Sequence, residues 1–67
     1  MRNMEILYDV YYGYYDGDEL TETFETYLAA IIFIKEYVEK QDYDFKILRK
    51  IEIDERGCEE ITILKEY

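Results

Sequence analysis

The spacing of apolar residues changes twice along this chain, and that change constrains the fold more than any other feature. Residues 4–15 alternate with a period of two, as a β-strand does, and carry apolar or aromatic side chains on both faces. Residues 27–41 instead follow the i, i+3, i+4 spacing of an amphipathic helix. Residues 42–54 and 58–67 return to the period of two. The chain is therefore expected to place strands on both sides of a single helix.

Two glycine-containing segments predict where the strands reverse. Residues 16–18 form a turn in which Gly17 can adopt positive φ, and a returning strand follows over 19–25. Gly57 serves the same purpose between the last two strands, and Thr26 is the expected N-cap of the helix. The order β-β-α-β-β predicts an α+β fold, a four-stranded, mainly antiparallel sheet with one helix packed on one face.

A chain of 67 residues has room for one core, so residues 1–67 are expected to form a single small domain. A domain of this size buries only about 60% of the surface that its unfolded form exposes. Cys58 is the single cysteine and can form neither an intramolecular disulfide nor a zinc site by itself. Stability is therefore expected from a well-packed core or from self-association.

The residue types that are missing argue against an enzyme. The chain has no histidine, the commonest general base and metal ligand, and no serine. The acidic stretch 16–19 lacks the loop pattern of a calcium-binding EF-hand. We therefore expect no catalytic residues, no metal site and no cofactor.

The charge of the chain restricts its partners. Seventeen acidic and eight basic residues give a net charge of −9, and the first 34 residues contain one base and seven acids. Direct binding to nucleic acid is disfavoured, because such binding depends on lysine and arginine neutralising phosphates. The acids either keep the protein soluble or face a protein partner with a basic surface.

The first strand is unusually rich in tyrosine. Alternation places Tyr8, Tyr12 and Tyr14 on one face, expected to be the core, and Tyr11 and Tyr15 on the other. On that uncovered face we expect the two tyrosines to join Leu7, Leu48 and Leu64. They form either a contact surface or an ordinary part of the sheet. The acids of the following turn and strand either extend this surface or only protect a sheet edge. The candidate partner-binding residues are Tyr11, Tyr15, Asp16, Asp18, Glu19 and Glu22.

The helix carries more apolar side chains than one sheet face can cover. The expected core stripe is Tyr27, Ala30, Ile31, Ile34 and Val38. Leu28, Ile32 and Phe33 lie beyond that stripe and are the candidates for self-association, most simply as a symmetric homodimer. The longest apolar run, residues 27–34, is far shorter than the roughly 20 residues of a membrane span. With no visible signal peptide either, a cytoplasmic protein with no membrane partner is expected.

In size, charge and lack of catalytic side chains, the chain resembles the small acidic inhibitors that viruses and phages make against host nucleic-acid enzymes. The resemblance lies in these general properties and not in a specific sequence motif. It implies a non-enzymatic protein-binding module that presents an acidic, tyrosine-rich hairpin to a basic nucleic-acid-handling protein. The alternative is a structural homo-oligomer whose excess apolar surface serves self-association.

Overall fold

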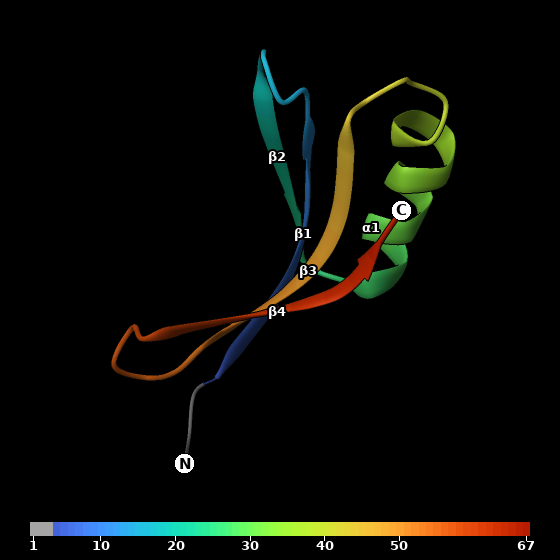
Figure 1. Cartoon of the computed structure of the whole chain (residues 1–67). Coiled ribbons are helices and arrows are strands. Elements are labelled where there is room, and N and C mark those ends of the chain that lie inside the picture. The colour runs from blue at the N-terminus through green and yellow to red at the C-terminus, as the bar shows by residue number, and fades with distance from the viewer. Residues whose placement is uncertain (1–3) are drawn as a thin grey trace.

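The computed structural model describes residues 4–67, which form one antiparallel sheet and one helix (Figure 1). The sheet order is β2-β1-β3-β4, and the predicted α+β fold is confirmed. The elements in chain order are β1 (Glu5–Gly13), β2 (Glu19–Phe24), α1 (Tyr27–Phe33), its continuation as the π-helix η1 (Ile34–Val38), β3 (Phe45–Ile53) and β4 (Glu59–Glu66).

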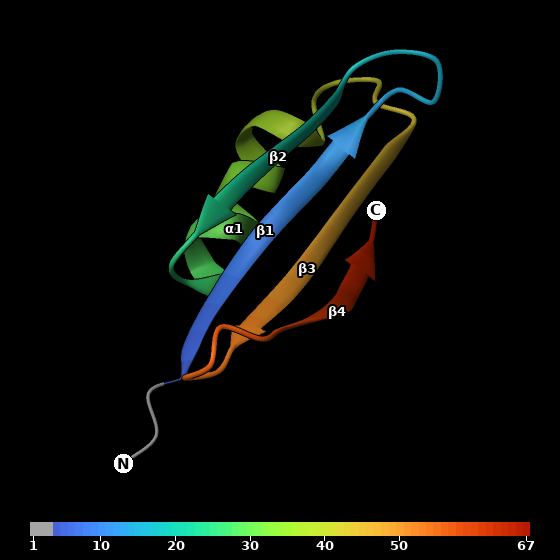
Figure 2. The same cartoon turned by 90° about the vertical axis from the view of Figure 1, so that its left-hand side faces the viewer.

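The helix covers only part of one face of a strongly twisted sheet. It lies behind β1 and β2 in Figure 2, whereas the turn between β3 and β4 extends away from it. Every buried apolar side chain of the described residues lies in the half of the sheet that the helix covers or in the helix itself, as Val10, Tyr12, Ala30, Ile34, Val38 and Leu48. Tyr27, expected in this stripe, is 51% exposed at the first helical position.

Thr26 caps the helix as predicted, because its Oγ1 accepts a hydrogen bond from the backbone N–H of Ala29 at 3.1 Å. The helix ends at Val38 rather than at Gln41. It widens near its end, where the N–H of Glu39 donates to the carbonyl of Ile34, five residues earlier, at 2.8 Å. Beyond Val38 the predicted segment carries no apolar side chain that could pack on the sheet, and the chain turns instead.

The register between β1 and β3 decides which side chains face the helix. Val10 lies opposite Leu48, and residues directly opposite each other share a face. Leu48 is therefore buried under the helix, and the expectation that it joins the uncovered face is wrong. Ile47 and Phe45 of β3 lie on the uncovered face instead, because Ile47 is opposite Tyr11 and Phe45 is opposite Gly13.

A β-bulge changes the alternation of the last strand. Leu48 pairs with Lys65, and the next residue, Arg49, pairs with Ile63, so Leu64 is an extra residue in β4. Ile61 and Ile63 therefore face the uncovered side, whereas Lys65 faces the helix side together with Leu48. Simple alternation over 58–67 would have put all these odd-numbered residues on one face.

Positive φ occurs at Gly13 and Gly57 rather than at Gly17. Gly57 has φ of 85°, as the predicted turn between β3 and β4 requires. Gly13 has φ of 155°, and a Cβ there would collide with the carbonyl oxygen of Asp18. The turn from β1 into β2 thus requires glycine at position 13, the last residue of β1.

Candidate functional site

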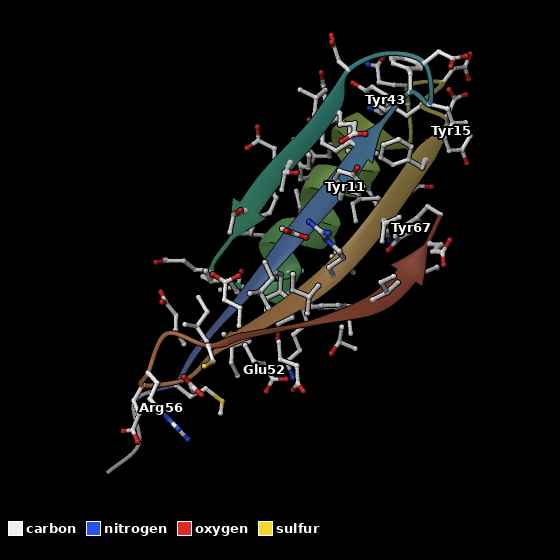
Figure 3. The ribbon with its side chains drawn as sticks, turned by 60° about the vertical axis from the view of Figure 1, so that its left-hand side comes forward. Tyr11, Tyr15, Tyr43, Glu52, Arg56 and Tyr67 are labelled. Carbon is white, nitrogen blue, oxygen red and sulfur yellow. The ribbon has the colours of Figure 1, made fainter. Side chains whose placement is uncertain are left out.

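Tyr11 and Tyr15 lie on the uncovered face near the end of β1 (Figure 3), and both rings lie close to that of Phe45. The Tyr11 ring lies 4.8 Å from the Phe45 ring, and the Tyr15 ring lies 5.7 Å from the same ring, centroid to centroid. Gly13, directly opposite Phe45, has no side chain, so the two tyrosines approach Phe45 from either side of it. We call Tyr11, Tyr15 and Phe45 the aromatic corner.

Tyr15 is held in place although its side chain is 77% exposed. Its backbone N–H donates to Oδ2 of Asp44 at 2.9 Å, and the N–H of Asp44 donates to the carbonyl of Gly13 at 2.8 Å. The N–H of Tyr14 closes the turn by donating to the carbonyl of Asp18 at 3.0 Å. These bonds fix the backbone at Tyr15, so less conformational freedom of this turn is lost when a partner binds.

A buried ion pair borders the aromatic corner. Nε and Nη2 of Arg49 donate to the two carboxylate oxygens of Asp9, each at 2.8 Å. Asp9 is 2% exposed, and the guanidinium lies 4.8 Å above the Tyr11 ring. The hydrogen bond to Asp9 raises the pKa of Arg49, so the guanidinium stays charged. At the edge of the corner, hydrogen bonding to the Glu19 carboxylate raises the pKa of Tyr11.

The structure brings together five of the six predicted partner-binding residues. Asp16 and Asp18 are exposed in the turn beside Tyr15, and Glu19 shares the face of Tyr11 because it pairs with Gly13. Glu22 lies opposite Val10 and therefore faces the helix side. The acidic surface beside the aromatic corner accordingly consists of Asp16, Asp18 and Glu19.

The three residues predicted for self-association have different surroundings. Leu28 is 66% exposed and Ile32 is 46% exposed on the outer side of the helix. Phe33 instead packs in the core, with its ring 5.2 Å from Phe24 and 5.3 Å from Tyr37. Of the three predicted residues, Leu28 and Ile32 are therefore available on the surface of the helix, whereas Phe33 is not.

Sequence reasoning missed Phe45, Asp44 and Arg49 as parts of this region. One signal was available, since Asp9 and Arg49 are single charges inside otherwise apolar rows, and a buried charge requires a partner. The contribution of Phe45 depends on the register between β1 and β3, which alternation alone does not give.

No family model, curated protein or solved structure matches this chain. Within residues 4–67, no helix is long and apolar enough to cross a membrane, and no three acidic or cysteine side chains converge as a metal site. A depression of about 430 Å³ at the turn between β3 and β4 is lined largely by acidic side chains, with Met4, Arg56 and Cys58. The aromatic corner, rather than this depression, combines exposed aromatic area with fixed geometry.

Proposed function

We propose that this chain is a non-enzymatic protein-binding module that inhibits a basic nucleic-acid-handling protein. The observation that supports the proposal is the aromatic corner, in which the exposed ring of Tyr15 and the partly exposed rings of Tyr11 and Phe45 lie beside three acids on a face that the helix leaves bare. Tyrosine is enriched among the residues that dominate binding energy at protein interfaces. Asp16, Asp18 and Glu19 would contact lysine or arginine of the partner where phosphates otherwise bind.

The two parts of the surface have different tasks. Burying the ring of Tyr15 would contribute about 1.5–3 kcal/mol of binding free energy. The acids would mainly raise the association rate and select a basic partner. Glu22 has no part in this surface, because it faces the helix side.

The acidic part is tested with two variants of equal charge. In the first, Asp16→Asn, Asp18→Asn and Glu19→Gln remove three charges beside the aromatic corner. In the matched control, Glu55→Gln, Glu59→Gln and Glu60→Gln remove three exposed charges near the turn between β3 and β4. Each is immobilised, and capture of proteins from a microbial lysate is measured with and without competing duplex DNA.

The proposal predicts that the wild-type chain captures a protein and that duplex DNA prevents this capture. The variant at Asp16, Asp18 and Glu19 should capture at least about tenfold less of this protein, whereas the control variant should capture as much as the wild type. Tyr15→Ala should weaken capture similarly without affecting the fold, because that ring is largely in solvent. Equal losses in both charge variants would reduce the effect to net charge and contradict the proposal. Capture that DNA does not affect would contradict mimicry of nucleic acid.

A further inference from the structure

Four tyrosine side chains form a cluster beside the end of the helix. Tyr12 belongs to β1, Tyr37 to η1, and Tyr14 and Tyr43 to the segments that follow β1 and precede β3. The ring centroids of Tyr12 and Tyr14 lie 4.8 and 5.2 Å from that of Tyr43, and the Tyr12 ring lies 6.4 Å from the Tyr37 ring. We call these four residues the tyrosine cluster. None of them belongs to the aromatic corner or to the acids beside it.

Two members of the cluster meet through their hydroxyl groups. The hydroxyl of Tyr43 donates a hydrogen bond to the hydroxyl of Tyr37, with 3.4 Å between the two oxygens. Within residues 4–67, no other pair of tyrosine hydroxyls is joined in this way; the rings of Tyr8 and Tyr27, for example, meet edge to face at 5.7 Å without such a bond. The bond between Tyr43 and Tyr37 brings the hydroxyl-bearing ends of the two rings together, including the ring carbons next to each oxygen.

The tyrosine cluster is open to solvent on its outer side. Tyr37 is 44% exposed and Tyr14 is 41% exposed, and Tyr43 is partly exposed. Tyr12, in contrast, is buried beneath them. An oxidant in solution can therefore reach the cluster directly at Tyr37, Tyr14 or Tyr43.

We propose that Tyr37 and Tyr43 are a site of oxidative cross-linking, at which hydrogen peroxide and a haem peroxidase produce a dityrosine. Each phenol loses one electron and its hydroxyl proton and becomes a phenoxyl radical. The two radicals form a carbon–carbon bond between the ring carbons next to their oxygens. Each of these carbons then gives up its hydrogen as a proton, and each oxygen regains a proton. Two electrons and two protons leave in total, and they reduce one hydrogen peroxide to two water molecules.

The fold favours this pair over the other tyrosines. Two reactive groups that are held in contact react far faster than two groups that must first meet. Distance along the chain does not select the pair, because Tyr11 and Tyr15 are closer in sequence but lie on either side of the Phe45 ring. The cross-link would close a loop from residue 37 to residue 43 and lower the conformational entropy of the unfolded chain, so it should raise the Tm. It does not depend on the proposed inhibitory function.

Treatment of the full chain with a haem peroxidase and hydrogen peroxide tests the proposal. All chains carry Cys58→Ser, because peroxide also oxidises an exposed thiol. A low protein concentration suppresses coupling between molecules. We expect a monomer that has lost two hydrogen atoms in its intact mass and that shows dityrosine fluorescence. Proteolysis and mass spectrometry should place the cross-link between Tyr37 and Tyr43.

Three substitutions by phenylalanine remove one hydroxyl each and keep the ring. Tyr37→Phe and Tyr43→Phe should each lower the yield of cross-linked monomer at least about tenfold, because phenylalanine forms no phenoxyl radical. Tyr27→Phe is the matched control, since it removes an exposed tyrosine from the other pair of rings, and it should leave the yield unchanged. Circular dichroism establishes that each variant is folded.

Three results would overturn the proposal. The first is a monomer that loses no hydrogen atoms while covalent oligomers form or no reaction occurs. The second is a cross-link that maps to another pair, such as Tyr11 and Tyr15. The third is a yield that Tyr37→Phe and Tyr43→Phe leave as high as Tyr27→Phe does. None of these results would affect the lysate test, which concerns the acids beside the aromatic corner.

Discussion

Substitution of Arg49 tests the energetic role of the ion pair in the middle of the uncovered face. Arg49→Met retains an unbranched apolar side chain but removes both hydrogen bonds to Asp9 and the guanidinium that lies over the Tyr11 ring. Asp9 is 2% exposed, so its carboxylate would be left buried and unpaired. Removing one partner of a buried pair typically costs about 3–5 kcal/mol. Since Arg49 itself is partly exposed and water can reach the vacated space, we expect about 3 kcal/mol.

That loss is large for a domain of this size. A 67-residue domain has a free energy of unfolding of about 3–10 kcal/mol. Each kcal/mol corresponds to about 4–8 °C in a small domain, so Arg49→Met should lower the Tm by about 12–24 °C. Urea denaturation followed by circular dichroism at low protein concentration measures the change in the free energy of unfolding.

A double-mutant cycle separates the ion pair from other effects. Asp9→Asn alone should also destabilise the protein, because one oxygen is replaced by an NH₂ group facing the guanidinium. The double variant Asp9→Asn, Arg49→Met should lose about 1.5–3 kcal/mol less than the sum of the single variants. Additive effects, or a cost below about 1 kcal/mol for Arg49→Met, would refute the assignment of the pair as a buried, coupled interaction.

Three further predictions concern the turn, the helix and the tyrosines. Gly13→Ala should lower the free energy of unfolding, measured by urea denaturation, by about 2–3 kcal/mol, because it combines positive φ with a collision. Gly57→Ala faces open space and should lower it by only about 1–2 kcal/mol. Equal losses in the two variants would contradict the collision. Thr26→Ala should cost about 1 kcal/mol and Thr26→Ser much less, and equal losses would show that the hydroxyl does not cap the helix. The hydroxyl of Tyr43 donates to that of Tyr37 at 3.4 Å, and this bond together with burial raises the pKa of Tyr43 to about 12. Because the folded pKa lies above the unfolded value of about 10, this stabilisation is complete below pH 10 and is lost as the pH rises towards 12. Ultraviolet absorbance should show a tyrosine that titrates near pH 12 and that Tyr43→Phe removes, and a late titration that persists unchanged in Tyr43→Phe would contradict the hydrogen bond.

Local signals in the sequence were sufficient for the elements of the fold. The Thr26 cap and the positive φ of Gly57 depend only on neighbouring residues, and both occur as predicted. The change from strand to helix period likewise needs no knowledge of distant contacts. For these reasons the order β-β-α-β-β could be read directly from the chain.

The assignment of faces required information that the sequence does not display. In β3 both Ile47 and Leu48 are apolar, so alternation permits either to face the helix. The choice is made by the register with β1, almost forty residues away, where Val10 meets Leu48. The bulge at Leu64 then reverses the faces of the last residues of β4. The candidate site was therefore predicted in its acids and tyrosines but not in its partners Phe45 and Asp44.

The position of the ion pair also bears on how the uncovered face stays soluble. Without it, the aromatic corner and the row of Leu7, Ile51 and Ile61 would join into one apolar surface along most of the sheet, and large exposed apolar surfaces promote non-specific association. Arg49 and Asp9 interrupt this surface with charges that are already bound to each other, so the interruption does not leave an unpaired buried group. The ion pair therefore divides the uncovered face into two smaller apolar surfaces, one on either side of Arg49 and Asp9.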